Sequence, residues 1–303
     1  MISRARLTLL TLAFLLLAPV GAAAQDTSTT VFIDVERALE LAEGGATLLD
    51  AREESDFRRA HLPDAVSLPW RSFVDGDQSG AISDDHARHQ RRLRAAGVFQ
   101  DRPVIVYGNW SNRGAWGEEG RLFWALEYFG HSQVYLLTGG IDAWRAADQP
   151  VSSGARVIDP RTAEFGDFQI RPRESRRATT AELLEDHRGD GAFLLLDTRE
   201  PTEYRGRVRY GEARPGHIPG AVHLWWRDLF DDDGDLLSPS DLQALLESRG
   251  ISLDRPLVAY CTGGIRSGFV YAVLRSLGAP DVRNYDASMW DWTARDDAPL
   301  STP

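Results

Sequence analysis

The sequence has very little cysteine: Cys261 is the only one among 303 residues. A single thiol cannot form a disulfide within its own chain, which excludes a disulfide-stapled scaffold and a mechanism that needs a second, resolving cysteine. An unpaired thiol in an oxidising compartment is also open to oxidation. Cys261 is therefore either a buried, inert side chain or a residue kept for its chemistry.

Lysine is absent as well: the 34 basic residues are all arginine, against 45 acidic ones, and the formal net charge is −11. A nucleic-acid-binding surface would need clustered cations, so we do not expect that class of partner. With 43% hydrophobic and 26% charged residues and a mean hydropathy of −0.33, the composition is typical of a soluble globular protein. The length suits two domains better than one compact core.

No apolar run reaches the roughly 20 residues that a membrane-spanning helix needs. The run at 7–19 follows Arg4 and Arg6 and precedes three alanines at 22–24. This order is typical of a signal peptide, here residues 1–24 with cleavage before Gln25, and an uncleaved anchor is the alternative. No cysteine lies at the cleavage site, which argues against a lipoprotein. We expect the mature protein in a bacterial periplasm or secreted, with no membrane contact after cleavage.

The chain repeats itself. Four segments return at separations of 147 to 156 residues: 48–53 at 195–200, 60–66 at 216–222, 102–107 at 255–260, and 139–144 at 287–292. A repeat of this length indicates two copies of one domain. We place the copies at 28–150 and 178–298, joined by a linker at 151–177 that is rich in Arg, Pro and Gly.

Each copy alternates short apolar runs with helical patterns. In the second copy, the runs 192–197, 256–260 and 282–285 have the length of strands, and helical patterns lie at 240–249 and 268–277. Strands that are apolar throughout are buried on both faces, as in a parallel sheet covered by helices. The sequence therefore predicts the α/β class, with two tandem domains that are each a mainly parallel sheet flanked by helices.

Cys261 lies where one of these strands ends, and a helix follows after a short loop that contains Gly263 and Gly264. Parallel sheets bind ligands at the carboxyl ends of their strands. Two glycines let successive N–H groups point inward and form an anion site, to which the helix adds its positive end. This setting predicts a lowered thiol pKa and a reactive thiolate that needs no histidine base.

Four motifs of the second copy resemble a rhodanese domain: Asp-Thr-Arg-Glu at 197–200, Gly-His-Ile-Pro-Gly-Ala at 216–221, Cys-Thr-Gly-Gly-Ile-Arg-Ser at 261–267, and Asn-Tyr-Asp at 284–286. The resemblance covers both copies, from about residue 30 to 296. It implies that a thiolate attacks the outer sulfur of a donor such as thiosulfate and releases sulfite. The persulfide then passes its sulfur to a thiophilic acceptor such as cyanide, a thiol or a protein.

By this resemblance Cys261 is the catalytic nucleophile, and no cofactor or metal ion is implied. The backbone N–H groups of the substrate-binding loop would hold the anionic persulfide; the loop comprises Thr262, Gly263, Gly264, Ile265, Arg266 and Ser267. Arg266 either attracts the anionic donor or, if Glu200 pairs with it, only supports the loop. Both interpretations stay open.

The first copy departs from the pattern, because Gly108 stands where the second copy has Cys261. Without a thiol it cannot carry sulfur, and it is expected to be a non-catalytic partner of the second domain. It also has five more residues than the second copy between Gly108 and the next shared glycine, Gly130. Asn109, Trp110 and Arg113 in this stretch are candidates to reach a ligand, although a structural role is favoured.

Several other features have structural interpretations. His61 and His217 occupy equivalent turns in both copies, so we expect them to stabilise those turns. The repeated Asp-x-Arg pairs, at 50–52 and 197–199, are expected to form internal ion pairs. The acidic run 231–235 lacks the spacing of a calcium loop and is expected to be a solvated turn. Among the nine tryptophans, Trp225 or Trp226 is a candidate for the pocket mouth.

Alternative functions remain to be separated. Phosphatases that resemble rhodanese domains have five residues between Cys and Arg, whereas here four separate Cys261 from Arg266, a loop too short for a phosphate. A non-enzymatic sulfur-carrier or protein-binding role is also open. Sulfurtransferases that prefer 3-mercaptopyruvate carry an arginine where this chain has Glu203, which favours thiosulfate as the donor. Nearby arginines at 205, 207 and 209 are possible substitutes for it.

Overall fold

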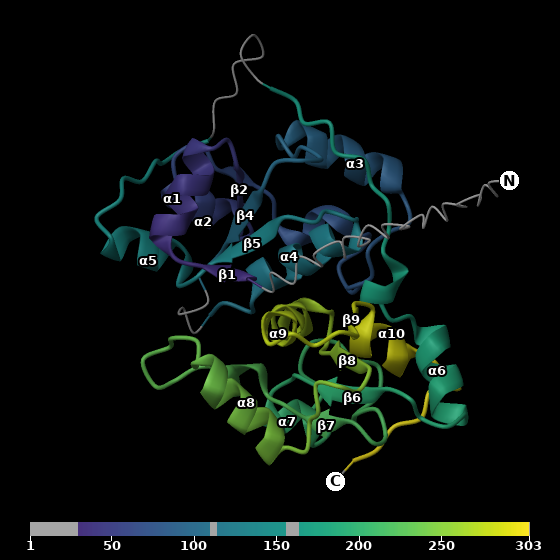
Figure 1. Cartoon of the computed structure of the whole chain (residues 1–303). Helices are drawn as coiled ribbons and strands as arrows, with labels where there is room; N and C mark the ends of the chain where they lie inside the picture. Colours follow the sequence, from purple (N-terminus) through teal and green to yellow (C-terminus); the bar gives the residue numbers. More distant parts are fainter. Residues whose placement is uncertain (1–29, 110–113, 156–163, 303) are drawn as a thin grey trace, which may run out of the picture.

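The computed structural model describes residues 30–109, 114–155 and 164–302, which form two α/β domains packed side by side (Figure 1). The expected signal peptide at 1–24 lies outside these residues. Within the described part of the chain, none of the helices combines the length and the apolar character that crossing a membrane requires.

The first domain is built on a five-stranded parallel sheet in the order β1-β5-β4-β2-β3. Its strands are β1 (Phe32–Ile33), β2 (Thr47–Asp50), β3 (Val66–Ser67), β4 (Val104–Tyr107) and β5 (Val134–Leu137). Its helices are α1 (Val35–Glu43), α2 (Glu54–Arg59), α3 (His86–Ala95), α4 (Glu118–Tyr128) and α5 (Gly140–Ala146), with a 3-10 turn, η1 (Trp70–Phe73).

The second domain repeats this plan with a four-stranded parallel sheet in the order β7-β6-β8-β9. Its strands are β6 (Leu194–Asp197), β7 (Val222–His223), β8 (Leu257–Tyr260) and β9 (Val282–Tyr285). Its helices are α6 (Thr180–Arg188), α7 (Pro201–Tyr204), α8 (Pro239–Ser248), α9 (Ile265–Ser276) and α10 (Ser288–Ala294), with 3-10 turns η2 (Glu174–Arg176) and η3 (Trp226–Leu229).

The central strands of the two sheets have the burial that the sequence predicts. All four residues of β4 and of β8 are buried, because helices cover both faces of each sheet. The fold class and the tandem arrangement are therefore confirmed. One helix differs: α9 begins at Ile265, three residues before the predicted 268, so part of the loop after Cys261 is already helical.

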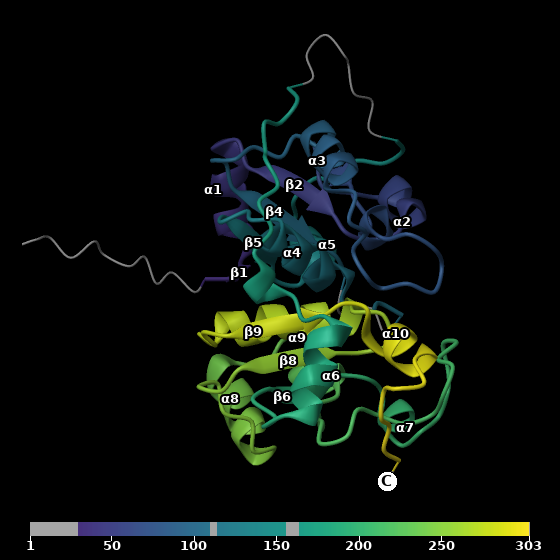
Figure 2. The ribbon, with the colours of Figure 1, turned by 90° about the vertical axis from the view of Figure 1, so that its right-hand side faces the viewer.

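One face of each sheet contributes to a core that both domains share. Buried side chains of α3 and α4 join those of α8 and α9 in a single hydrophobic cluster, whereas the outer faces, under α1 and α5 and under α6 and α10, have separate cores. In Figure 2, α9 lies between its own sheet and the first domain. The shared core fixes the two domains relative to each other.

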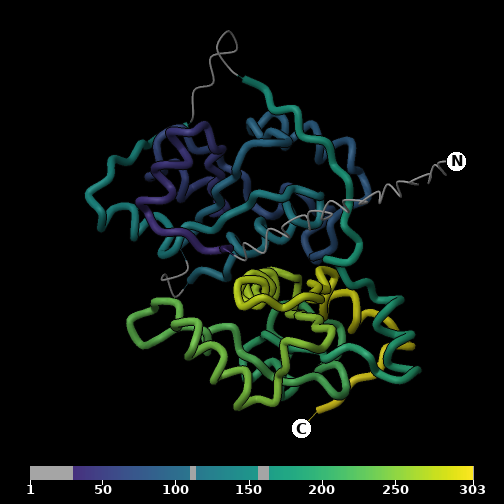
Figure 3. Tube along the Cα trace, in the orientation of Figure 1, coloured from purple at the N-terminus to yellow at the C-terminus, as the bar shows by residue number. Residues whose placement is uncertain are grey.

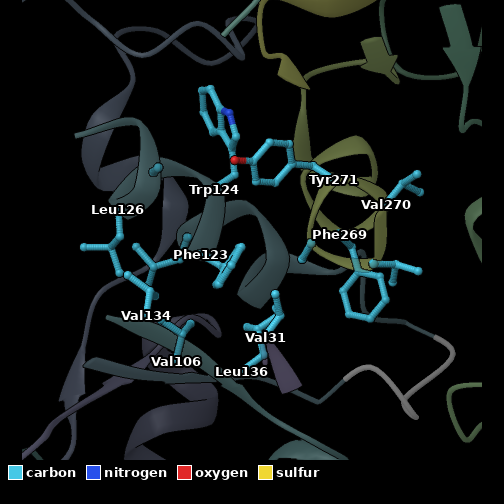
Figure 4. Packing of buried hydrophobic residues seen from close by; sticks show 14 of the residues in the cluster. Val31, Val106, Phe123, Trp124, Leu126, Val134, Leu136, Phe269, Val270 and Tyr271 are labelled. Atoms are coloured by element: carbon cyan, nitrogen blue, oxygen red, sulfur yellow. The ribbon is translucent and has the colours of Figure 1, made fainter. Parts of the chain in front are cut away.

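Helices α4 and α9 form the centre of this contact. Phe123 of α4 lies beside Tyr271 of α9, with their ring centres 6.4 Å apart, and Figure 4 shows these side chains in the shared core. The backbones also come close at Gly120, where an added Cβ would lie 2.3 Å from the Phe269 Cα. Small residues permit this approach, and the large aromatic side chains beside them fill the core.

The predicted linker is only partly a free connection. Figure 3 follows the chain down the side of the first domain before it enters the second. Along this path, Phe168 is fully buried in the shared core and its carbonyl accepts a hydrogen bond from Arg94 at 2.8 Å. The Ile170 N–H donates to Gln90 at 2.9 Å. The segment 164–173 therefore belongs structurally to the first domain.

Candidate active site

Cys261 directly follows β8, at the carboxyl edge of the second sheet, and its side chain is 1% exposed. The loop turns back over the thiol within three residues. Gly264 N–H donates to Cys261 Sγ at 3.1 Å, and α9 begins at the next residue. The thiol therefore lies between a loop amide and the positive end of a helix, as the sequence predicts.

The loop conformation depends on Gly264. This residue caps α9 with φ at +79°, in the left-handed region that side chains other than glycine rarely adopt. An added Cβ would also lie 2.7 Å from the Asp286 carbonyl oxygen. Glycine is therefore required both for the turn and for the space around it.

The electrostatic setting of Cys261 favours the thiolate. Burial opposes ionisation, but the charge of Arg266, the N–H groups of Ser267 and Gly263 and the Ser267 hydroxyl outweigh it and lower the pKa of the thiol. Because α9 starts early, Ser267 lies in the first helical turn, where its N–H is free to bind an anion.

Arg266 forms a buried ion pair with Glu203 of α7. Its two terminal nitrogens donate to the two Glu203 oxygens at 2.6 and 3.0 Å, and Thr262 Oγ1 donates to Glu203 at 2.8 Å. Burial alone would raise the pKa of Glu203, but Arg266 holds it below its usual range. Glu200, the partner for Arg266 that the sequence left open, binds Arg209 at the surface instead.

Arg266 therefore supports the loop and also borders the pocket. It is 3% exposed, and its guanidinium lies 5.4 Å from the ring centre of Trp116 and 5.7 Å from that of Tyr210. The cation is held in one position by an ion pair and two aromatic rings. Of the two interpretations left open by the sequence, this geometry favours loop support.

The repeated Asp-x-Arg pairs are internal ion pairs, as predicted. Arg199 donates to Asp197 at 2.7 Å in the second domain, and Arg52 donates to Asp50 in the same way in the first. In each domain the arginine also binds the carbonyl of the segment that leads into the His-x-Pro turn. The pairs join two segments at the carboxyl edge of each sheet.

The paired histidines stabilise turns, which confirms the prediction. His61 stacks on Phe57, and its Nδ1 is 2.9 Å from the Phe57 carbonyl oxygen. His217 stacks on Tyr204 and makes the same contact with the Tyr204 carbonyl at 2.9 Å. Both imidazoles therefore fix a turn, which precedes β3 in the first domain and β7 in the second.

A cavity of about 260 Å³ opens onto Cys261 between the domains. Its walls are largely aromatic: Trp70 and Trp116 come from the first domain, and Tyr210 and Trp290 come from the second. Trp290 covers the loop so closely that a Cβ on Gly263 would lie 2.2 Å from its ring. Neither Trp225 nor Trp226, the candidates from the sequence, lines this cavity; Trp226 is buried in the shared core.

No sequence pattern predicts these walls, because their positions depend on how the domains pack. Trp116 belongs to the longer connection between β4 and α4, and Arg227 of the second domain donates to the Ala115 carbonyl beside it at 2.9 Å. Asn109 begins the same connection but does not line the cavity, and Trp110 and Arg113 lie outside the described residues. Charged groups from the first domain, Glu53, Arg71 and Glu118, complete the rim.

The first domain has filled its own site. Glu119, the second residue of α4, takes the place that Arg266 has in α9, and its carboxylate lies where a side chain at Gly108 would be: an added Cβ would be 2.1 Å from Glu119 Oε2. Burial, helped by the neighbouring Glu118, raises the pKa of Glu119 to about 8. In the first domain the protonated carboxyl group of Glu119 therefore occupies the space where the second domain has its anion-binding site.

Ser288 adds a contact that the sequence analysis missed. Cys261 N–H donates to Ser288 Oγ at 3.1 Å, and this hydroxyl donates to the Tyr285 carbonyl at 2.6 Å. The residue has φ at +53°, and the equivalent Gly140 of the first domain has φ at +54°. The sequence signal that would have identified it is Gly140 at the matching position of the repeat, because a glycine there indicates a left-handed backbone that Ser288 must also adopt.

None of the described residues forms a cluster of three or more His, Cys, Asp or Glu that could hold a metal ion. The acidic run 231–235 forms a tight turn instead, in which Asp231 accepts hydrogen bonds from the N–H groups of Asp233 and Asp235.

We expect Ser288→Gly to separate folding from reactivity. The change relieves the left-handed backbone but removes the oxygen that holds the Cys261 N–H, so the melting temperature should stay equal or rise while alkylation of Cys261 by iodoacetamide at pH 7 slows about tenfold. Ser288→Ala keeps the strain, and it should react as slowly and melt at a lower temperature than Ser288→Gly. Wild-type reactivity in Ser288→Gly would contradict this role.

Glu119 should make stability depend on pH. Its folded pKa lies above the unfolded value of about 4.3, so its stabilising effect is full below that pH and is lost as the pH rises toward 8. Urea unfolding should show the wild type losing about 2–4 kcal/mol between pH 5 and pH 8 from this group. Glu119→Gln should lack that part of the loss, and an equal pH slope in both proteins would refute the assignment.

Comparisons with known proteins identify the family of the chain. The rhodanese-like domain family matches residues 34–147 and 180–295. The sulfur carrier protein TtuD of Thermus thermophilus is 34% identical over 77% of this chain and 82% of its own, and a thiosulfate sulfurtransferase of Corynebacterium glutamicum is 31% identical over 86% and 87%. The crystal structure of the 3-mercaptopyruvate sulfotransferase SseA from Escherichia coli has the same fold, with a TM-score of 0.71 at 23% identity over 86% of this chain and 98% of that one. The chain therefore belongs to the rhodanese family, with one rhodanese-like domain in each half.

Proposed function

We propose that the protein is a sulfurtransferase that uses Cys261 to move a sulfane sulfur from thiosulfate to a thiophilic acceptor. The Cys261 thiolate attacks the outer sulfur of thiosulfate, the S–S bond of the donor breaks, and sulfite leaves with the electron pair of that bond. The enzyme retains a persulfide on Cys261. Attack of cyanide or a thiolate on the outer persulfide sulfur then releases thiocyanate or a new persulfide and regenerates the thiolate.

The observation that carries this proposal is the lowered pKa of Cys261 inside a loop of amides. The first step needs a thiolate as nucleophile, and the second needs it as leaving group, so both steps gain from a stabilised anion. In the persulfide the charge moves one sulfur further out. We assign the loop residues 262–267 to bind that charge through their N–H groups, with Arg266 and Ser267 contributing from the first turn of α9.

The tightness of the loop supports sulfur transfer over phosphate hydrolysis. The Gly264 N–H already lies at hydrogen-bond distance from Sγ itself, 3.1 Å. A phosphorylated cysteine would need its amides arranged around the phosphate oxygens, which lie two bonds beyond Sγ, in a wider loop. The four-residue spacing between Cys261 and Arg266 thus fits a sulfur atom.

Thiosulfate is the proposed donor, and 3-mercaptopyruvate is the alternative. Glu203 stands where a carboxylate-binding arginine would be needed, and it is fully buried against Arg266, so it leaves no cation there for the donor. Arg209, one of the possible substitutes, is paired with Glu200. The name of the relative from Corynebacterium glutamicum supports the same choice.

The acceptor is proposed to be a small thiophile that enters the cavity of about 260 Å³, or a protein thiol presented at its mouth. The relative from Thermus thermophilus is named a sulfur carrier protein, which keeps a carrier role as a second candidate function. In both functions the sulfur is held as a persulfide on Cys261. The sulfurtransferase and the carrier differ in whether the protein turns over repeatedly with donor and acceptor.

Intact mass spectrometry tests the proposal directly. After incubation with thiosulfate, the wild type should gain the mass of one sulfur atom and lose it again on addition of cyanide, because Cys261 is the only thiol in the chain. Cys261→Ser is the matched control and should gain nothing. Steady-state rates with thiosulfate should exceed those with 3-mercaptopyruvate. A wild type that takes up no sulfur from either donor would exclude the enzyme function.

We also propose that the protein is exported, on the basis of residues 1–24. Expression of the full chain in a bacterium should place it in the periplasmic fraction with Gln25 as its first residue, because small residues at 22–24 suit signal peptidase. Replacement of Leu10 by Arg interrupts the apolar core and should retain an unprocessed chain in the cytoplasm. Processed protein in both cases, or in neither, would refute the assignment.

A further inference from the structure

A buried arginine of the first domain lies directly behind the nucleophile loop of the second. Arg121, on α4, is 1% exposed. Its Nη1 donates to the Gly264 carbonyl at 3.3 Å, and its Nη2 donates to the Gly80 carbonyl. One guanidinium therefore connects the loop around Cys261 to a loop of the domain that has no thiol.

The second domain leaves room for this guanidinium. A Cβ on Gly264 would lie 2.6 Å from Arg121 Nη1, and a Cβ on Gly268 would lie 2.7 Å from the Arg121 Cα. The loop and the first turns of α9 thus have glycine at the two points where Arg121 approaches. Gly80 likewise lies so close to the loop that its Cβ would be 2.3 Å from the Gly263 carbonyl oxygen.

Arg121, Arg177 and Asp286 form a charged cluster whose charges do not sum to zero. Asp286, also 1% exposed, is 3.9 Å from Arg121 Nη2 and 2.9 Å from the Nε of Arg177. Two guanidiniums share one carboxylate, which leaves one positive charge in excess. By contrast, Arg266 is matched by Glu203.

An anion on Cys261 is positioned to offset this excess. Burial lowers the pKa of Arg121 to about 10, and the charges of Asp286 and Cys261 act in the opposite direction. The group therefore remains a cation at neutral pH, and a buried cation is stabilised by a nearby negative charge. The two aromatic faces beside it, of Trp124 at 4.5 Å and Trp70 at 6.0 Å, supply only weaker stabilisation.

We propose that Arg121 is a positioning residue of the active site: it holds the nucleophile loop through Gly264 and places a positive charge behind the Cys261 anion. The first domain, which lacks a nucleophile, thereby completes the site in the second. The inference builds on the proposed function, since the anion concerned is the one that would receive and carry sulfur.

The titration of Cys261 is the property that separates this role from simple packing. The charged groups that face the thiol are Arg266, with its partner Glu203 behind it, and Arg121 from across the domain contact. Glu53, Arg71 and Glu118 of the first domain also line the cavity that opens onto Cys261. Because the chain has one thiol, alkylation by iodoacetamide followed by intact mass reports Cys261 alone.

The experiment measures the rate of alkylation against pH in the full chain. In Arg121→Met the thiol pKa should rise by about one unit, which is about tenfold less thiolate at a pH below both values. Arg121→Lys retains the charge, and its thiol pKa should stay within about 0.3 units of wild type. A wild-type thiol pKa in Arg121→Lys would show that the charge at position 121, rather than the volume of the side chain, lowers the pKa of Cys261.

Asp286→Asn supplies a test of opposite sign. It removes the carboxylate that offsets Arg121 and Arg177, so the thiol pKa should fall below the wild-type value. If Arg121→Met and Asp286→Asn acted only by loosening the loop, the thiol pKa would shift in the same direction in both variants. If Arg121→Met does not fold, the fall in Asp286→Asn and the unchanged value in Arg121→Lys decide the question.

Arg275→Met is the matched control. Arg275 also joins α9 to α4, through Glu127 at 3.3 Å, but it lies three turns along α9 from the loop. Its loss should lower the melting temperature without moving the thiol pKa. An unchanged thiol pKa in Arg121→Met, a rise in Asp286→Asn, or an equal rise in Arg275→Met would overturn the proposal. Because alkylation does not involve sulfur transfer, a chain that takes no sulfur from thiosulfate refutes the proposed function and leaves this result standing.

Discussion

The packing of α4 against α9 determines the position of the nucleophile loop, because that loop is the N-terminal entry to α9. The two helices approach closely at Gly120, where backbone meets backbone, and their aromatic residues fill a core that both domains share. Close packing of this kind has few alternative arrangements. The thiol, its loop amides and the aromatic walls of the cavity are consequently held by contacts that cross from one domain to the other.

Buried arginines carry the electrostatics of the site, and each acts through its geometry as much as its charge. Arg266 uses two nitrogens on Glu203 and remains beside the thiol, and Arg121 reaches two carbonyls in different domains. A planar group with several donors can do this, whereas an ammonium group acts as a point charge. The result is a thiolate stabilised without a histidine base, whose pKa is lowered even though the thiol is almost fully buried.

The two domains show how one scaffold supports a site or closes it. At the second helical position after the loop, the second domain has Arg266, which favours an anion, and the first has Glu119, which is itself held protonated. At the left-handed position after the last strand, the second domain has Ser288 and the first has Gly140. At this position a left-handed, non-glycine backbone is found where a hydroxyl contacts the nucleophile, as expected of a functional site.

The sequence alone predicts the α/β class, the tandem repeat, Cys261 as the candidate nucleophile and Gly108 as its inactive counterpart. These follow from local pattern and from comparison of the chain with itself. The carboxylate that pairs with Arg266 is known only from the folded chain, because Glu203 and Glu200 lie on the same short segment and only Glu203 is buried beside Arg266. The tertiary structure also decided the walls of the cavity and the place of Arg121, since both depend on contacts between residues more than 100 positions apart, which no local pattern encodes.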